Sequence, residues 1–158
     1  MIEPRSRAPA YVLYFLVLCL SLLWSGTASA EGCGHHLGVG AGLVHRDTPS
    51  ETKFTLGADY ECRRDALFGI GAFFNHVFAD PGFSAIGLPQ LLLHPIGGDF
   101  FVAGSPILEF GDRTGTHLGL RLSTRVPLPI GLFILVPSFA IDFINGGRHY
   151  WFGLGLKF

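Results

Sequence analysis

Charged residues are scarce in this chain, and neither sign dominates. Of its 158 residues, 11 are Lys or Arg and 12 are Asp or Glu, so the formal net charge is −1. This balance gives no basic footprint of the kind that nucleic-acid-binding proteins carry. The composition also lacks the alanine, glutamate, lysine and leucine bias of helical proteins. Glycine (22 residues), phenylalanine (15) and hydrophobic residues (49%) are abundant instead, and the mean hydropathy is +0.43.

Long hydrophobic runs are absent except for one near the N-terminus. Arg5 and Arg7 precede an apolar run at residues 11–24, and the small residues Ala28-Ser29-Ala30 follow it. This order is typical of a cleaved export signal, and the run is shorter than the roughly 20 residues of a spanning helix. An uncleaved anchor is the alternative. We expect a signal peptide at 1–30 and one mature domain at 31–158.

The end of the chain alternates between apolar residues and small or polar ones. One side of residues 148–158 carries Tyr150, Phe152, Leu154, Leu156 and Phe158, and the other carries Trp151, Gly153, Gly155 and Lys157. A period of two predicts a strand, and this apolar face suits lipid, with aromatics where hydrocarbon meets water. Because no open sheet edge survives in lipid, the other strands would have to close a barrel.

The same alternation recurs in seven earlier segments, separated by turn residues. The eight expected strands lie near 37–43, 53–61, 68–78, 83–93, 100–110, 118–126, 132–143 and 148–158. Pro89 predicts a bulge or irregularity in the fourth, and residues 127–131 are expected to form a turn. The pattern predicts an all-β fold: an eight-stranded antiparallel up-and-down transmembrane β-barrel preceded by a signal peptide.

Two hairpins can be given a register. Asn145-Gly146 is a strong two-residue turn signal. It pairs Phe143 with Arg148, Asp142 with His149, Ile141 with Tyr150, Phe139 with Phe152, and Phe133 with Phe158. In the first hairpin, a turn centred near residues 47–48 pairs Leu37 with Ala58.

Extending the register of the first hairpin brings Cys33 opposite Cys62. In an exported chain this favours a disulfide. Two independent thiols, or a metal site made by Cys33, His35 and His36, are the alternatives.

Polar residues gather on the face that would line the barrel. They are Lys53, Asp59, Glu61, Glu109, His117, Arg121, Arg125, Asp142, His149 and Lys157. The register brings Glu109 opposite His117 and Asp142 opposite His149, so the sharper hypothesis is a hydrolase or metal site with Ser105 as the nearest nucleophile. We expect instead an ion-pair network that fills a narrow lumen, with no catalytic residue, no metal and no cofactor.

Several stretches together resemble a known family. They are the leader ending Ala28-Ser29-Ala30, GVGAG (38–42), FGIGAFFNHVF (68–78), LEFGDRTGTHLGLRL (108–122) and GLGLKF (153–158). The chain resembles the outer-membrane β-barrel domain family, the small OmpA- and OmpX-like barrels of Gram-negative bacteria. The resemblance implies insertion by the barrel-assembly machinery, which reads a terminal aromatic such as Phe158. The expected outer loops, only a few residues each, depart from the adhesin-like members.

These expectations together describe a monomer in the outer membrane. Its partners are outer-membrane lipids and the assembly machinery, and its role is structural, in membrane integrity, without enzymatic activity. One alternative is a barrel that binds a small ligand or lipid headgroup, such as a soluble lipocalin-like carrier with the two faces exchanged. A lipid-acting hydrolase is the other, although the sequence has no His-x-Ser pair on a lipid-facing strand.

Overall fold

The computed structural model describes residues 33–47, 49–63, 65–96, 100–111, 115–131 and 133–157. The strands are β1 (Gly34–Asp47), β2 (Ser50–Arg63), β3 (Phe68–Phe78), β4 (Phe83–Leu93), β5 (Phe101–Gly111), β6 (Gly115–Arg125), β7 (Leu128–Ile130), β8 (Phe133–Ile144) and β9 (Gly147–Lys157). The predicted signal peptide at 1–30 and Phe158 lie outside the described residues. Within those residues, no helix has the length and apolar character to cross a membrane.

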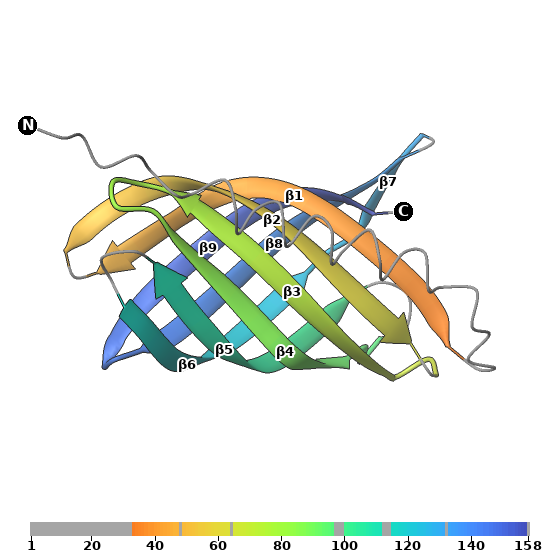
Figure 1. Ribbon diagram of the computed structural model, residues 1–158. Helices are drawn as coiled ribbons and strands as arrows, with labels where there is room; N and C mark the ends of the chain where they lie inside the picture. Colours follow the sequence, from red (N-terminus) through yellow and green to blue (C-terminus); the bar gives the residue numbers. More distant parts are fainter. Residues whose placement is uncertain are drawn as a thin grey trace, which may run out of the picture. The chain divides into compact units, whose positions relative to one another are not determined.

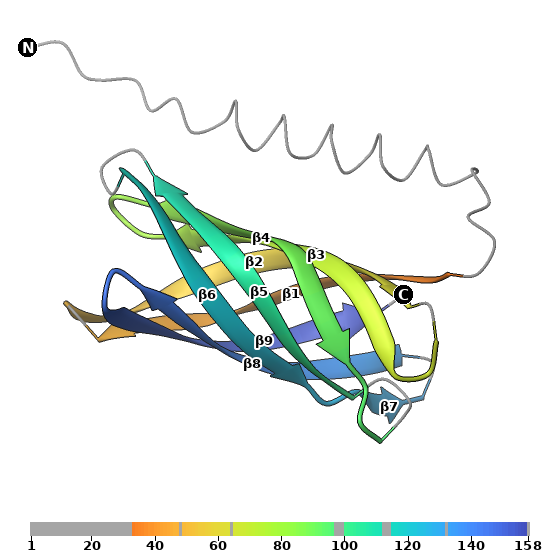
Figure 2. The ribbon, with the colours of Figure 1, turned by 90° about the horizontal axis from the view of Figure 1, so that it is seen from below.

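The strands close into an antiparallel barrel (Figure 1, Figure 2). Sequence neighbours pair from β1 to β6, and the ring is completed by the pairs β6–β8, β8–β9 and β9–β1. β7 continues the register of β6 along β8, since Arg125 faces Ser138 and Leu128 faces Leu135. Pro127 lies in the break and has no N–H to donate. β6 and β7 are therefore one interrupted strand, and the barrel has the eight strands that the sequence predicted.

The turn predicted at residues 127–131 is wrong in extent. The chain reverses only between Ile130 and Phe133, where Gly131 has φ 60°. The short β7 hairpin projects beyond the barrel wall in Figure 1. The alternation of residues could not predict the β7 hairpin. Prolines such as those at 127 and 129 occur both in turns and at the edges of sheets, so they do not distinguish the two.

The two rims of the barrel differ in the connections that they carry. The termini rim holds Cys33 and Lys157, together with the connections 64–67 and 94–100 and the β7 hairpin. The hairpin rim holds the connections 48–49, 79–82, 112–114 and 145–146. No connection at the hairpin rim is longer than four residues, which confirms the prediction of short loops there.

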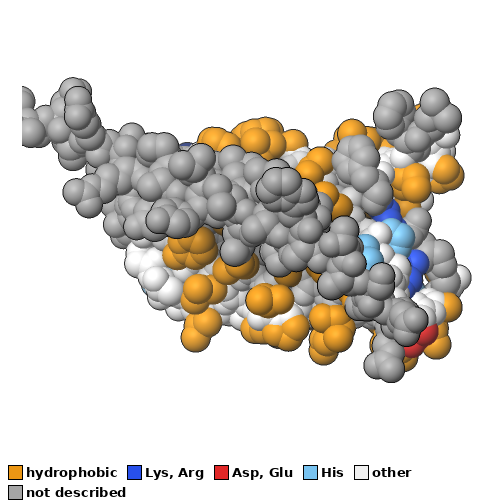
Figure 3. Space-filling view, turned by 45° about the vertical axis from the view of Figure 1, so that its right-hand side comes forward, with side chains coloured by type: hydrophobic (Ala, Val, Ile, Leu, Met, Phe, Trp, Pro, Cys, Tyr) orange, Lys and Arg blue, Asp and Glu red, His pale blue; other side chains and the backbone are white. Residues whose placement is uncertain are grey.

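The two faces of the wall differ sharply in chemistry. On β6, Leu120 and Leu122 are each 48% exposed, whereas Arg121 between them is 4% exposed. Other exposed side chains on the outer face are Val39, Leu43, Phe54, Leu56, Ile70, Phe78, Leu118, Phe152 and Leu154. Figure 3 shows such hydrophobic side chains spread over the visible wall. The predicted alternation of apolar outside and polar or small inside is confirmed.

The β8–β9 hairpin has the predicted register. Asn145 and Gly146 form the turn, with φ values of 51° and 75°. Asp142 faces His149, Ile141 faces Tyr150 and Phe139 faces Phe152. Positive φ at both turn positions matches the right-handed twist of the strands, which is why Asn-Gly specifies this turn. The predicted pair of Phe133 with Phe158 lies outside the described residues.

The predicted register of β1 and β2 is wrong by two residues. Leu37 faces Tyr60 instead of Ala58, and the last pair before the turn is Asp47 with Ser50. A shift of two leaves every side chain on the same face, so hydrophobic alternation cannot distinguish the two registers. Pro49 lies in the turn, where its missing N–H interrupts no ladder.

The disulfide between Cys33 and Cys62 is present, with a Cα–Cα distance of 5.6 Å. In the observed register His35, not Cys33, is paired with Cys62. The bond therefore joins Cys33, just before β1, diagonally to β2. The two thiols are consumed, so the alternatives of independent thiols and of a metal site with Cys33, His35 and His36 are both wrong.

The irregularity predicted near Pro89 is also present. The β4–β5 register shifts between Gly87 and Leu91, and Leu88 and Pro89 are both exposed. Two consecutive outward residues change the phase of the alternation, as a bulge does. Gln90 and Leu92 are consequently the inward residues in the second half of β4.

The seam between β1 and β9 is lined by glycine on its inner face. Gly40 faces Gly155 and Gly42 faces Gly153. A Cβ on Gly42 would lie 2.8 Å from the Gly153 Cα and closer still to the Phe152 carbonyl oxygen. Both contacts are with backbone, which cannot move aside as a side chain can. The first and last strands can therefore meet here only without inner side chains.

Gly42→Val should weaken barrel closure by about 1–3 kcal/mol, because a bulky side chain forces the backbone of β9 outward. Urea unfolding of the refolded barrel measures this loss. Gly104→Ala is the matched control, since a Cβ there meets only a Leu122 side-chain carbon at 3.8 Å. Equal unfolding midpoints for the two variants would contradict the seam as described.

Candidate functional site

The interior is organised by three arginines, each of which meets a carboxylate and an aromatic ring. Arg121 on β6 forms the middle layer. Its Nε and Nη2 donate to the two carboxylate oxygens of Asp142 over 2.5 and 2.6 Å, and Trp151 Nε1 donates to the same carboxylate over 2.5 Å. The Arg121 guanidinium lies 4.1 Å from the centre of the Phe73 ring and 4.4 Å from the Trp151 ring. Asp142 is fully buried, so this layer blocks the middle of the barrel.

The hairpin-rim layer is built around Arg46. Its Nη2 donates to Glu109 Oε1 over 2.9 Å, and its guanidinium lies 3.8 Å from the centre of the Phe83 ring. His149 Nδ1 is 3.2 Å from Glu109 Oε2, without the angles of a hydrogen bond. Glu51 approaches Arg46 at 3.9 Å and pairs with Lys53 at 3.3 Å. This chain of charges therefore lies at the end of the lumen near the hairpin rim.

The termini-rim layer has two parts. Arg125 on β6 pairs with Asp59 on β2, and its guanidinium lies 5.3 Å from the centre of the Phe101 ring. Beside them, Glu61 accepts hydrogen bonds from Arg63 Nε at 2.9 Å and from His94 Nε2 at 2.8 Å.

His94 links the two connections of the termini rim through hydrogen bonds to Leu67 and Phe100. Its backbone N–H donates to the Leu67 carbonyl over 2.7 Å, and its Nδ1 lies 3.0 Å from the Phe100 carbonyl. The side chain is completely buried. It is therefore a structural histidine that ties residues 64–67 and 94–100 to β2.

Eight of the ten residues predicted inside take part in the contacts of these layers described above. The eight are Lys53, Asp59, Glu61, Glu109, Arg121, Arg125, Asp142 and His149. Lys157 lines a cavity near the termini rim. His117 faces Glu109 in the β5–β6 ladder, half-buried.

The two carboxylate–histidine pairs expected from the register do not form. Asp142 faces His149 in the ladder, yet its carboxylate is held by Arg121 and Trp151. Glu109 faces His117, yet Arg46 and His149 approach its carboxylate. Arg121 is the partner of Asp142 in the β6–β8 ladder and binds its carboxylate with two N–H groups, which a histidine cannot do. Arg46 on β1 has the length to meet Glu109 on β5, where it donates one N–H group.

Sequence reasoning missed several members of the layers. Arg46 and Glu51 lay outside the predicted strands at 37–43 and 53–61, although β1 extends to Asp47 and β2 begins at Ser50. Continuing the alternation of Gly42 and Val44 by one step would have placed Arg46 inside. His94 follows Leu93 and precedes a proline, and no pattern in the sequence indicated its role.

The described residues give little support to catalysis. Ser105 Oγ lies 3.2 and 2.7 Å from the carbonyl oxygens of Pro89 and Pro106, so its hydroxyl is engaged by backbone. Across the described strands, no group of three His, Cys, Asp or Glu side chains is placed to hold a metal ion.

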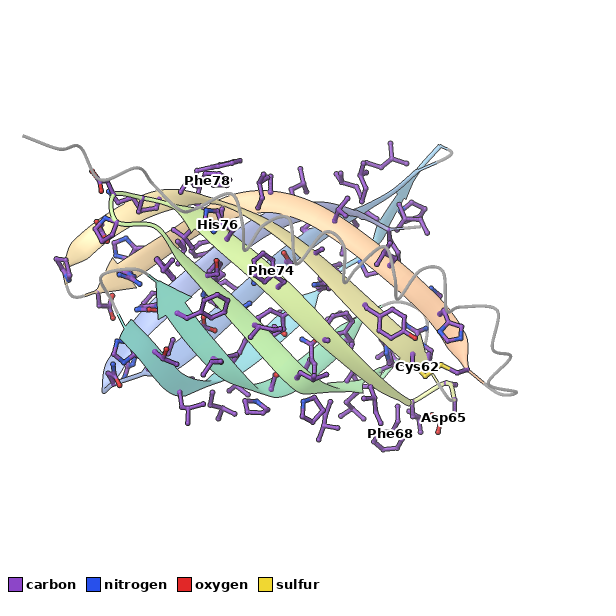
Figure 4. All side chains as sticks on the ribbon, viewed as in Figure 1. Cys62, Asp65, Phe68, Phe74, His76 and Phe78 are labelled. Carbon is purple, nitrogen blue, oxygen red and sulfur yellow. A yellow bond between two sulfur atoms is a disulfide. The ribbon has the colours of Figure 1, made fainter. Side chains whose placement is uncertain are left out.

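One serine–histidine pair lies on the outer face. His76 Nδ1 is 2.9 Å from Ser84 Oγ, on neighbouring strands β3 and β4. Figure 4 labels His76 between Phe74 and Phe78 in the outward row of β3. In the described part of the chain, no carboxylate forms an ion pair with His76, so the third group of a hydrolytic triad is missing.

Between the middle and termini-rim layers lies a cavity of about 110 Å³. One wall is backbone, because Gly38, Gly40, Gly42, Gly153 and Gly155 carry no side chain. The facing side chains include hydroxyls and amides from Thr55, Asn75, Gln90, Ser123 and Ser138.

Solved structures of small bacterial barrels are similar to this chain. Neisserial surface protein A (NspA) has 13% sequence identity and a TM-score of 0.55, over 80% of this chain and 98% of that chain. Ail of Yersinia pestis, in complex with the heparin analogue sucrose octasulfate, has 12% identity and a TM-score of 0.53, over 81% of this chain and 100% of that chain. The N-terminal β-barrel domain of Pseudomonas aeruginosa OprF has 7% identity and a TM-score of 0.57, over 80% of this chain and 99% of that chain.

No protein-family model and no curated protein sequence matches this chain. The structural likeness establishes the fold alone: this is an eight-stranded antiparallel β-barrel, as the resemblance in the sequence implied.

Proposed function

We propose that this protein is a monomeric outer-membrane barrel whose role is structural. The observation that carries the proposal is the combination of an apolar outer wall with an interior blocked by Arg121, Asp142 and Trp151. An apolar wall is stable in hydrocarbon, and a blocked interior neither conducts nor holds a bulky ligand.

Amphipathic rings at both rims of the outer wall support a membrane location. Near the termini rim, His35 Nδ1 lies 2.6 Å from the Tyr60 hydroxyl. Near the hairpin rim, the His45 and Tyr150 rings lie 6.4 Å apart. Aromatic girdles of this kind flank the apolar band of outer-membrane barrels, where hydrocarbon meets water.

In the proposed orientation the hairpin rim faces outward and the termini rim faces the periplasm. Residues 1–30 would direct export, and Phe158 would present the terminal aromatic to the assembly machinery. The short hairpin-rim connections leave no protruding surface for adhesion. Ail was solved in complex with a heparin analogue, and its 12% identity with this chain supports a shared fold but no shared ligand.

A soluble carrier with the faces exchanged is disfavoured by the same geometry. It would have to leave Leu118 (76% exposed), Phe152 and Leu154 in water while burying Arg121 and Asp142. A lipid-acting hydrolase is disfavoured because His76 and Ser84 lack an acidic partner among the described residues. We therefore assign no enzymatic activity.

Expression of the full chain followed by fractionation tests this proposal. The protein should be found with outer membranes, and its unboiled form should migrate differently from the boiled form on detergent gels, because closed barrels resist unfolding. In planar bilayers the purified barrel should give no stable conductance steps. Recovery in the soluble fraction would overturn the membrane location, and regular conductance steps would overturn the blocked lumen.

A further inference from the structure

The cavity on the termini side of the lumen is closed at its inner end. The buried side chains of Arg121 and Trp151 line it there and belong to the layer that blocks the barrel. At the other end its lining includes His36, Pro127 and Lys157, all partly exposed at the termini rim. Figure 3 brings this rim forward and shows histidine and basic side chains among apolar ones. The cavity is thus a blind pocket with its mouth at the termini rim.

The pocket's charged side chains are largely neutralised by one another. Asp59 is paired with Arg125, and Glu61 is held by Arg63 and His94. Arg121 is neutralised by Asp142 behind the pocket. Inward of Lys157, which lies at the mouth, the acidic and basic side chains that line the pocket are therefore paired with opposite charges, which disfavours an ion in its interior and favours a neutral molecule.

Neutral polar groups supply the directional chemistry. Gln90 Nε2 donates to Ser123 Oγ over 3.3 Å, and Thr55 Oγ1 donates to the His76 carbonyl over 2.9 Å. Within the described residues, the Asn75 amide and the Ser138 hydroxyl have no hydrogen-bond partner, although both line the pocket. Several hydroxyl and amide groups that converge on a backbone wall are suited to a ligand with several hydroxyls.

The volume limits the size of the occupant. An engineered cavity of roughly 150 Å³ accommodates benzene, with six carbon atoms. A pocket of about 110 Å³ that is open at one end accommodates a chain of about three carbons with their hydroxyls. Because the lining is polar, the pocket without ligand would hold water, which such a ligand would displace.

We propose that this pocket binds a small neutral polyol of about the size of glycerol, entering from the termini rim. The Asn75 amide and the Ser138 hydroxyl are its principal hydrogen-bonding partners, and the glycine wall of β1 and β9 lies against its carbon chain. This site goes beyond a structural role. It does not depend on the membrane location, which affects only the compartment from which the ligand comes.

Saturation-transfer NMR with glycerol and the full barrel in deuterated detergent tests the site. We expect saturable binding with a Kd in the millimolar range, as six non-hydrogen atoms permit. Ser138→Val and Asn75→Leu should each weaken binding at least about fivefold, because each removes a hydrogen-bonding group from the pocket. Thr52→Val is the control: it alters a side chain on the outer face and should leave glycerol binding unchanged. 1-Butanol, of similar size with one hydroxyl, should bind at least about fivefold more weakly than glycerol.

The migration of each unboiled variant on detergent gels shows whether it has folded. If both pocket variants fail to fold, a crystal structure of the unaltered barrel soaked in glycerol shows whether glycerol occupies the pocket. Glycerol within hydrogen-bond distance of Asn75 or Ser138 supports the site. Only water in the pocket, a signal that does not saturate, or equal binding of 1-butanol overturns it. None of these results bears on fractionation with outer membranes, so failure of the pocket and failure of the membrane location are distinguishable.

Discussion

Arg121→Leu should destabilise the folded barrel by about 3–5 kcal/mol, because it leaves the Asp142 carboxylate buried without a countercharge. Asp142 is fully buried, and Trp151 Nε1 would be its only remaining hydrogen-bond donor among the contacts described. Removing one partner of such a pair costs more than the pair itself contributes, since the charge that is left has been taken out of water. Urea unfolding in lipid vesicles measures the loss.

Two comparisons isolate the cause. Lys53→Leu breaks the pair with Glu51 at the hairpin rim, where both side chains are about one-third exposed, and should cost no more than about 1 kcal/mol. The double variant Arg121→Leu with Asp142→Leu should recover much of the loss, because no charge remains unpaired. If Arg121→Leu proves as mild as Lys53→Leu, the middle layer does not hold the barrel together as described.

Leu120→Arg should cost about 2–4 kcal/mol and strongly reduce membrane insertion, because Leu120 lies midway along β6 on the outer face. Thr116→Arg is the matched control. It lies on the same face of the same strand, close to the hairpin rim, where an arginine costs only about 0–1 kcal/mol. The folded fraction after refolding into vesicles, read from the migration of unboiled samples, is the measurement. Equal folding of the two variants would contradict the assignment of the outer face.

Much of the wall could be predicted from the sequence because its signals are local. Alternation identified the eight strands and their faces, as on β6, where Leu120 and Leu122 lie outside and Arg121 inside. Asn145-Gly146 fixed the register of β8 and β9, because few turns accept positive φ at both positions. The predicted register of β1 and β2 was wrong, because a shift of two residues leaves every side chain on the same face. The residues around Pro49 also do not define which two residues lie at the centre of the turn.

The partners within the lumen could not be predicted in the same way. The sequence placed Arg121, Asp142 and Glu109 inside, but not the contacts that they make. Arg46 meets Glu109 and Phe83 from distant parts of the chain, and such contacts across the lumen depend on barrel closure and side-chain length. Alternation placed the aromatic side chains that contact the arginines inside the barrel, but nothing in the sequence indicated which arginine each ring would contact. The pocket likewise depends on the pairing of glycines between β1 and β9, the first and last strands, which alternation within one strand does not predict.

The tryptophan of the barrel reports directly on which face of the wall meets lipid. Trp151 is 5% exposed and lies inside, whereas its neighbour Phe152 is 54% exposed on the outer wall. The other tryptophan of the chain, Trp24, lies in the predicted signal peptide. The double substitution Trp151→Phe with Phe152→Trp exchanges these two neighbours. It moves the single tryptophan of the barrel from the lumen to the lipid-facing side, because successive side chains of a strand point to opposite faces.

The decisive measurement is quenching of tryptophan fluorescence by lipids brominated on their acyl chains, for the folded mature barrel and for this exchanged variant. We predict little quenching of Trp151 and strong quenching of the tryptophan at position 152. Strong quenching of Trp151 together with weak quenching at position 152 would show that the apolar face lines the interior, and would contradict an outer wall that faces lipid.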